Sequence, residues 1–256
     1  MGNLSARGLR VVRGGTTVLS GVDLDARVGT LSAIVGPNGA GKTTLLGALA
    51  GELRPAAGTV ALDGVALSAL GAAERARTLT TLAGGTTAPS LTVREAVVTG
   101  RFAHHAWWDW RRTAADATEA DTAIERVGLA AYADRSFDTL SSGEQQRAWI
   151  ALALAQGARV LLLDEPTSHL DVRYAHEVLG LLKRVAAGGA TVVVVLHDLN
   201  EAAAYADHVA LLAAGTLIAQ GTPRALIDPA LLERAYGVAF TAVDLEGKRR
   251  VFPAAP

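Results

Sequence analysis

Cysteine is absent from this chain of 256 residues, and so is any long hydrophobic run. Without cysteine there can be no disulfide bond and no thiolate metal site, which fits a reducing compartment. Half of the residues are hydrophobic, yet no apolar run approaches the length of about 18 residues that crosses a bilayer. Residues 1–7 also lack the apolar core of a signal peptide. We therefore expect a soluble, cytoplasmic chain that reaches a membrane only through a partner.

An excess of charge is lacking too, because 24 basic and 25 acidic residues give a net charge of −1. Bulk electrostatics therefore does not attract the chain to nucleic acid or to anionic lipid. Lysine is scarce: all of the basic residues are arginine except Lys42, Lys183 and Lys248. A lysine inside a motif of this chain therefore indicates a specific chemical need.

One such lysine lies in a glycine-rich segment with the pattern G-x-x-x-x-G-K-T. It follows a predicted strand at residues 31–35 and opens a predicted helix. The glycines let backbone N–H groups turn around a phosphate chain, the lysine can reach the β- and γ-phosphates, and the threonine hydroxyl can bind Mg²⁺. The predicted phosphate-binding residues are Gly36, Pro37, Asn38, Gly39, Ala40, Gly41, Lys42, Thr43 and Thr44.

A second candidate is the apolar run at residues 161–163, which ends in Asp164 and Glu165. So short a run suits a strand buried on both faces of a parallel sheet, whose carboxyl edge is where ligands bind. Alone, the run leaves open the alternative of an ordinary strand that enters a polar turn. Together with the phosphate loop it indicates nucleoside triphosphate chemistry. Asp164 would hold Mg²⁺ through its water shell, and Glu165 would polarise the attacking water.

Two further segments are ambiguous in isolation. Ser141 and Glu144 match a helix capping box, although a serine hydroxyl and the N–H of Gly143 at a helix N-terminus could also bind an anion. The apolar strand predicted at residues 191–196 ends in His197, and a single histidine there is more often an ordinary polar residue than a catalytic one.

Residues 101–112 contain three of the four tryptophans, at Trp107, Trp108 and Trp110. Such a cluster could stack on nucleic acid bases, dock a helix of a partner, or cap the core of a helical layer. The adjacent His104 and His105 would point to opposite faces of any regular element, so we do not expect them to share a metal ion.

Five motifs in order resemble those of ATP-binding cassette (ABC) ATPases over essentially the whole chain: residues 36–43, 140–144, 161–165, 168–171 and His197. The resemblance implies an α/β fold with a P-loop NTPase (RecA-like) core at about residues 1–85 and 148–256. An antiparallel β subdomain would lie along the N-terminal part of this core. A helical subdomain would be inserted at about residues 90–147, within a single ATP-binding domain.

The resemblance also implies a mechanism. ATP and Mg²⁺ would be the cofactors, and two copies would form a head-to-tail homodimer around the nucleotide. Ser141 and Gly143 would bind the γ-phosphate in trans and His197 in cis, and Asp171 would belong to the nucleotide site. Integral-membrane permease subunits would convert the dimer's opening and closing into transport, and they would hold the chain at the inner face of the membrane.

A finer resemblance is to the ATPases of iron–siderophore, haem and cobalamin importers. It rests on residues 91–95, 100–101, 146–156 and 196–202. In such systems other subunits bind the transported substrate, including a substrate-binding protein.

Three departures from the family pattern keep alternatives open. Gly84 stands near the place of a glutamine that contacts Mg²⁺, Arg13 replaces an aromatic residue that stacks on adenine, and Ser142 and Glu144 replace signature residues. The guanidinium plane of Arg13 could still stack on adenine. The missing glutamine suggests, as one alternative, a cassette that binds ATP but turns it over slowly. Another alternative is a soluble ABC protein that acts on ribosomes or DNA, but such chains usually carry two cassettes.

Overall fold

The computed structural model describes residues 2–83, 90–105, 113–245 and 247–254. In it, the strands predicted at residues 31–35, 161–163 and 191–196 belong to one six-stranded sheet. Five strands are parallel, and the edge strand β10 is antiparallel to its neighbour. In spatial order they are β10 (Thr216–Gly221), β9 (His208–Ala213), β3 (Leu31–Val35), β8 (Thr191–Val195), β7 (Val160–Asp164) and β6 (Leu79–Ala83). Alternate residues of β3, β7 and β8 belong to two different hydrophobic clusters, so the sheet is buried on both faces.

Strand β6 corrects a prediction, because the polar composition of residues 78–89 indicated a connecting segment. Residues 79–83 instead pair in parallel register with β7, from Leu79 opposite Val160 to Ala83 opposite Asp164. Threonine is β-branched and fits a pleated strand, and an edge strand needs a partner on only one side. The prediction of a connecting segment, made from the polar composition, is therefore wrong for residues 79–83.

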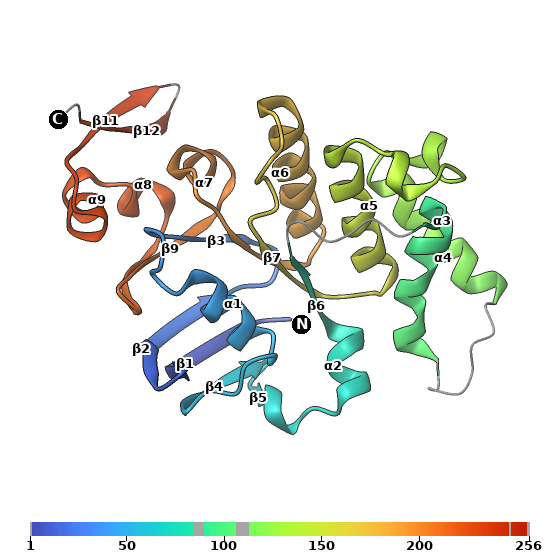
Figure 1. Ribbon diagram of the computed structural model, residues 1–256, viewed down its shortest axis with the longest axis horizontal. Coiled ribbons are helices and arrows are strands. Elements are labelled where there is room, and N and C mark those ends of the chain that lie inside the picture. The colour runs from blue at the N-terminus through green and yellow to red at the C-terminus, as the bar shows by residue number, and fades with distance from the viewer. Residues whose placement is uncertain (1, 84–89, 106–112, 246, 255–256) are drawn as a thin grey trace.

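A second, antiparallel sheet has the order β2 (Thr16–Ala26), β1 (Leu4–Arg13), β4 (Ala57–Leu62) and β5 (Val65–Ala66). The two strand segments predicted at residues 17–19 and 22–28 are one strand, β2. Gly21 interrupts their pattern with a φ of 68°, where the pairing with β1 shifts register. Helix α1 (Lys42–Leu49) packs between the two sheets in a shared apolar cluster (Figure 1).

The helical layer lies beside the edge of the parallel sheet that β6 forms (Figure 1). It contains α3 (Val93–Val98), the 3₁₀ segment η2 (Thr99–His104), α4 (Ala114–Arg126), η3 (Ala130–Tyr132), η4 (Phe137–Thr139) and α5 (Ser142–Ala155). The capping boxes predicted for α3 and α5 are both formed, and Thr113 with Asp116 forms a third at the start of α4. The boundary expected near residues 147 and 148 falls inside α5, which runs unbroken from the helical layer toward the sheet.

The remaining helices cover the core or precede a C-terminal hairpin. They are η1 (Leu67–Ala69), α2 (Ala72–Thr78), α6 (Val172–Ala187), α7 (Leu199–Tyr205), α8 (Pro223–Leu226) and α9 (Pro229–Tyr236). The hairpin joins β11 (Phe240–Leu245) to β12 (Lys248–Pro253). Two arginines of the hairpin make polar contacts: Arg249 lies 3.2 Å from Asp244, and Arg250 donates to the carbonyl oxygen of Asn200.

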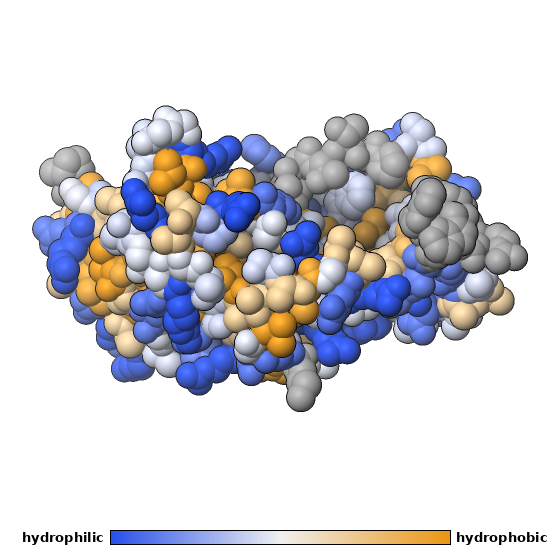
Figure 2. All heavy atoms as spheres, turned by 90° about the horizontal axis from the view of Figure 1, so that it is seen from below, coloured by the Kyte–Doolittle hydropathy of each residue, from blue (hydrophilic) through white to orange (hydrophobic). Residues whose placement is uncertain are grey.

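Over the described residues, no helix combines the length and the apolar character that a bilayer crossing requires. On the face seen in Figure 2, hydrophobic residues form small groups separated by hydrophilic ones. The parallel six-stranded sheet, the antiparallel sheet and the helical layer together confirm the predicted α/β class.

Candidate active site

The phosphate loop connects β3 to α1, and its glycines are required by close approaches of the backbone. A Cβ on Gly36 would lie 1.9 Å from the carbonyl oxygen of Leu212. Gly41, the N-cap of α1, has a φ of 99°, and its Cβ would lie 2.9 Å from Leu19 Cδ2. Any side chain at either position would move the loop away from its supports. Glycine at these two positions therefore lets the loop pack closely against Leu212 and Leu19.

Lys42 folds back over this loop. Its Nζ donates to the carbonyl oxygens of Gly36, at 2.8 Å, and Pro37, at 3.1 Å. The side chain is buried, and burial lowers the pKa of Lys42, whereas the carboxylates of Glu165 and Asp164 raise it. The two carboxylates therefore favour the charged ammonium that burial disfavours.

Asp164 ends strand β7 with one oxygen unsatisfied. Its Oδ1 is buried and has no hydrogen-bond partner among the described residues. Burial raises the pKa of Asp164, the nearby Thr43 hydroxyl lowers it, and the charge of Glu165 raises it again, so that the net shift is upward. Since Mg²⁺ and its bound water prefer oxygen ligands, a carboxylate and a hydroxyl placed together beside the phosphate loop fit that ion.

Glu165 and His197 extend from the ends of the neighbouring strands β7 and β8 and meet each other. Glu165 Oε1 lies 2.5 Å from His197 Nε2. Glu165 has a φ of 51°, and its carbonyl oxygen accepts hydrogen bonds from the backbone N–H and the hydroxyl of Ser168. The turn after β7 therefore holds Glu165 in the left-handed region that few side chains adopt.

A cavity of about 550 Å³ joins these parts. Its lining brings together most of the residues predicted for the cis half of the site, and adds Val18, which the sequence did not single out. The lining residues are Arg13, Val18, Asn38, Gly39, Ala40, Gly41, Lys42, Thr43, Thr44, Glu165 and His197. Val18 could have been found only from the fold, because it belongs to the antiparallel sheet that packs beside α1.

Ser141, Gly143 and Asp171 do not line this cavity. The hydroxyl of Ser141 donates to Glu144 Oε2 at 2.8 Å in the capping box. Gly143 packs under Tyr174, whose Cγ would lie 2.7 Å from an added Cβ, and Asp171 accepts from the N–H of Tyr174 at 2.9 Å. Within one chain Ser141 and Asp171 therefore cap α5 and α6, and the glycine at 143 leaves room for Tyr174 at the start of α6.

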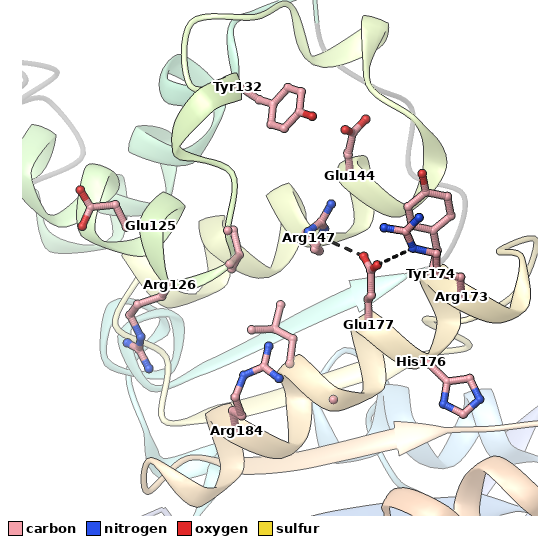
Figure 3. Close-up of a pocket in the computed structure, with 14 residues that line it drawn as sticks. Glu125, Arg126, Tyr132, Glu144, Arg147, Arg173, Tyr174, His176, Glu177 and Arg184 are labelled. Carbon is pink, nitrogen blue, oxygen red and sulfur yellow. Dashed lines mark hydrogen bonds and ion pairs between the residues drawn. The ribbon is translucent and has the colours of Figure 1, made fainter.

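A second cavity, of about 600 Å³, lies between α4, α5 and α6 (Figure 3). Glu177 in α6 is 3.0 Å from Arg173 and 3.8 Å from Arg147. The Nε of Arg147 is buried and has no hydrogen-bond partner within the described ranges. The sequence did not predict this charged cavity, because its residues come from three helices far apart in the chain. It contains no residue of the phosphate loop.

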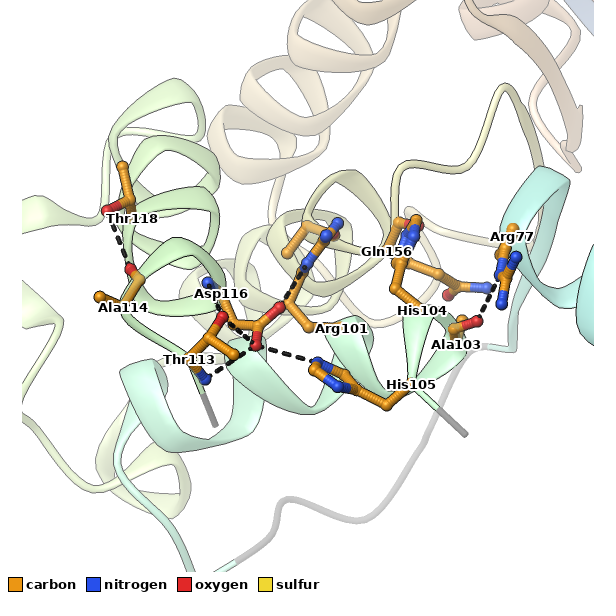
Figure 4. Close-up of polar contacts among 11 residues, drawn as sticks. Arg77, Arg101, Ala103, His104, His105, Thr113, Ala114, Asp116, Thr118 and Gln156 are labelled. Atoms are coloured by element: carbon orange, nitrogen blue, oxygen red, sulfur yellow. Dashed lines mark hydrogen bonds and ion pairs between the residues drawn. The ribbon is translucent and has the colours of Figure 1, made fainter. Parts of the chain in front are cut away.

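His104 and His105 contact different partners (Figure 4). His104 Nε2 lies 2.8 Å from the carbonyl oxygen of Gln156, and His105 Nε2 lies 2.9 Å from Asp116 Oδ2. Among the described residues, no group of three or more histidines, aspartates or glutamates is placed to hold a metal ion. Gly84 and the tryptophans at 107, 108 and 110 lie outside the described residues, so the interpretations that concern them stay predictions.

Comparison with known proteins identifies the family. The profile of the family described as "ABC transporter" matches residues 19–168, more than half of the chain. The chain belongs to the ABC transporter family. The predicted family, its P-loop α/β fold and its class as an ABC-type ATPase are thereby confirmed.

Relatives in this family include several import proteins. The chain is 40% identical to the ferric enterobactin transport ATP-binding protein FepC of Escherichia coli (strain K12), over 89% of this chain and 84% of the relative. It is 46% identical to the hemin import ATP-binding protein HmuV of Nocardia farcinica, over 91% and 82%. The iron(3+)-hydroxamate import ATP-binding protein FhuC of Bacillus subtilis is 37% identical, over 93% and 89%.

Solved structures agree with the fold. A metal-chelate type ABC transporter in an inward-facing conformation matches with a TM-score of 0.85 and 26% identity, over 100% of this chain and 98% of that one. A nucleotide-free ATP-binding cassette matches with a TM-score of 0.80 at 24% identity, over 91% and 98%, which supports the fold alone.

Proposed function

We propose that this ABC ATPase energises the import of an iron–siderophore or haem-type substrate through membrane permease subunits. The observation that carries the proposal is the cavity in which the phosphate loop, Glu165 and His197 meet. The substrate class follows from the relatives, whose names specify ferric enterobactin, hemin and iron(3+)-hydroxamate.

The phosphate loop binds the triphosphate through its N–H groups and Lys42. Thr43 and Asp164 would hold a Mg²⁺ ion, and the ion would supply positive charge that neutralises the phosphate oxygens. The position of Arg13 in the cavity lining supports stacking of its guanidinium on the nucleotide base.

Glu165 orients and polarises the attacking water. Its contact with His197 Nε2 holds the two side chains together in the lining of the cavity that also contains the phosphate loop. His197 donates a hydrogen bond there, either to Glu165 or to the γ-phosphate once it is present. Both roles require that β7 and β8 end at the same edge of the sheet, which their parallel register provides.

A second copy of the chain completes the site with its Ser141, Gly143 and Asp171. In support, none of these residues lines the cavity of its own chain, and Ser141 and Gly143 lie at the N-terminal end of α5, where the neighbouring Ser142 is exposed. The dimer sits at the inner face of the membrane through its permease subunits, and a substrate-binding protein delivers the substrate to them from the other side.

Hydrolysis of MgATP by the purified chain with its permease tests the proposal. Glu165→Gln should lower kcat about 10²- to 10⁴-fold, the range for loss of a general base, while ATP still binds. The control is Glu233→Gln, since Glu233 is an exposed residue of α9 outside the cavity lining and should leave kcat unchanged. Equal turnover of the wild type and Glu165→Gln would refute the mechanism. Stimulation of turnover by a ferric siderophore or by haem, with the binding protein present, tests the substrate class.

A further inference from the structure

The loops that follow Glu165 and His197 are joined by a second contact, two residues beyond the glutamate and four beyond the histidine. The hydroxyl of Thr167 donates to Glu201 Oε2 at 2.9 Å. Thr167 belongs to the turn after β7, and Glu201 lies in the first turn of α7, which follows β8. The two strand-end loops are therefore bound at two points, Glu165–His197 and Thr167–Glu201.

Glu201 stands in surroundings that disfavour its charge. Burial raises the pKa of Glu201, and the hydrogen bond from Thr167 partly offsets this effect. The charge of Asp198 raises the pKa further, and that of His176 lowers it. A partly buried carboxylate is costly unless its hydrogen bonds are used, so the donor at Thr167 stabilises Glu201 where it is.

The turn that contains Thr167 also sets the position of Glu165. Ser168 binds the carbonyl oxygen of Glu165 through its N–H at 3.1 Å and its hydroxyl at 2.8 Å. The N–H of Leu170 donates to the carbonyl oxygen of Thr167 at 3.2 Å. Because these bonds are local to the turn, they do not themselves orient it relative to β8 and α7. The Thr167–Glu201 bond supplies that orientation.

We propose that Glu201 is a positioning residue for ATP hydrolysis. It holds Thr167, and through the turn it holds Glu165 against His197. The inference rests on the proposed function, since it concerns the same hydrolytic pair. Glu201 itself lies outside the cavity lining, so it acts through Thr167 rather than on the nucleotide.

A purely structural role for α7 predicts different behaviour. The same helix is also anchored on another side, where the Asn200 side chain accepts from the N–H of Val251 at 2.9 Å and donates to its carbonyl oxygen at 3.1 Å. Asn200→Ala removes this anchorage to β12 without removing the Thr167–Glu201 bond. It is the matched control, because it loosens α7 next to Glu201.

Steady-state kinetics of Thr167→Val, Glu201→Ala and the double variant test the proposal. Each single change should lower kcat about tenfold, because small displacements of catalytic groups cost rate, with KM for MgATP within about twofold of the wild type. The double variant should be no slower than either single variant, since both remove one interaction. Thr167→Ser, which keeps the hydroxyl, should restore kcat, and Asn200→Ala should leave it near the wild-type value. Unchanged kcat in the single variants, or multiplicative losses in the double variant, would overturn the proposal.

Hydrogen exchange gives a readout that does not need turnover. Thr167→Val and Glu201→Ala should both speed exchange of the Ser168 amide, which binds Glu165, whereas Asn200→Ala should speed exchange only at Val251. Unaltered Ser168 exchange in both variants contradicts the inference whatever the kinetics. Lack of wild-type turnover would instead refute the proposed function, and with it the catalytic consequence of the contact.

Discussion

Two aspartates in different layers of the molecule show how the same type of side chain serves two purposes. Asp116, at the start of α4, accepts from the N–H and hydroxyl of Thr113, lies 2.9 Å from His105 Nε2, and accepts from Arg101 Nε (Figure 4). Asp164, at the end of β7, has a buried oxygen, Oδ1, that finds no hydrogen-bond partner in the part of the chain that the structure describes. The first carboxylate is satisfied by its own chain, and the second is left available for a ligand.

The pKa values of the two carboxyl groups shift in opposite directions. Burial tends to raise the pKa of Asp116, but the hydrogen bonds from Thr113, Arg101 and His105 outweigh it and lower the pKa well below its usual range. Burial raises the pKa of Asp164, and the nearby donors do not offset it. A buried acid therefore marks a functional site here when its own chain leaves it unsatisfied.

The largest effect should follow from neutralising the unsatisfied carboxylate. Asp164→Asn should lower kcat for MgATP about 100-fold or more, because the amide is a poor ligand for Mg²⁺. Without nucleotide, the same variant should melt about 2 °C higher than the wild type. The reason is that a group whose pKa is raised on folding stabilises the protein only while protonated, and this contribution is lost as the pH rises to neutrality.

The control for this change is Asp134→Asn, since the Asp134 side chain is 85% exposed and should affect neither quantity. Differential scanning calorimetry and a phosphate-release assay measure the two effects. A lower melting temperature for Asp164→Asn would show that the Asp164 carboxylate is stabilised by its surroundings, as that of Asp116 is. The contrast between the two aspartates would then be wrong.

A loss of stability is expected for Asp116→Ala. It should lower the free energy of unfolding by about 3 kcal/mol, because Arg101 and the N–H of Thr113 lose their buried acceptor. The affinity for ATP should not change, since neither Asp116 nor its partners line the nucleotide cavity. Urea unfolding measures the loss, with Glu119→Ala, an exposed change on the same helix, as the control. A loss below about 1 kcal/mol would mean that the hydrogen bonds to Asp116 contribute little.

These two aspartates also show how far the sequence predicts the structure. Asp164 was predictable, because the strand, the phosphate loop and the adjacent Glu165 each have a local pattern. Thr113 and Asp116 also match a capping box locally. The other partners of Asp116 did not follow from the sequence, since the contact with Arg101 spans 15 positions, and Arg101 in turn donates to the carbonyl oxygen of Ala155, 54 positions away.

Strand β6 and the signature segment mark two other limits. The sequence of residues 79–83 is compatible with a loop, and it is pairing with β7 that makes it a strand. The local pattern of Ser141 and Glu144 predicted the capping box correctly, but a role of Ser141 and Gly143 in trans depends on a second copy. The contact of Gly143 with Tyr174 gives a reason for glycine within one chain that the motif alone did not suggest.

The smallest predicted effect is the acid dependence of the difference between the wild type and Asp116→Ala. A carboxyl group whose pKa is lowered on folding stabilises the protein fully above the unfolded pKa of about 4, and this contribution is lost as the pH falls toward the folded value. The gap in melting temperature between the two proteins should therefore be constant from pH 7 to pH 5 and shrink by pH 3. For Asp164→Asn the gap has the opposite sign, because the variant is the more stable protein, and it also shrinks on acidification as Asp164 becomes protonated in both states. A gap for Asp116→Ala that widens on acidification would contradict the assigned direction of the pKa shift and would place the stability of α4 in packing instead of in this carboxylate.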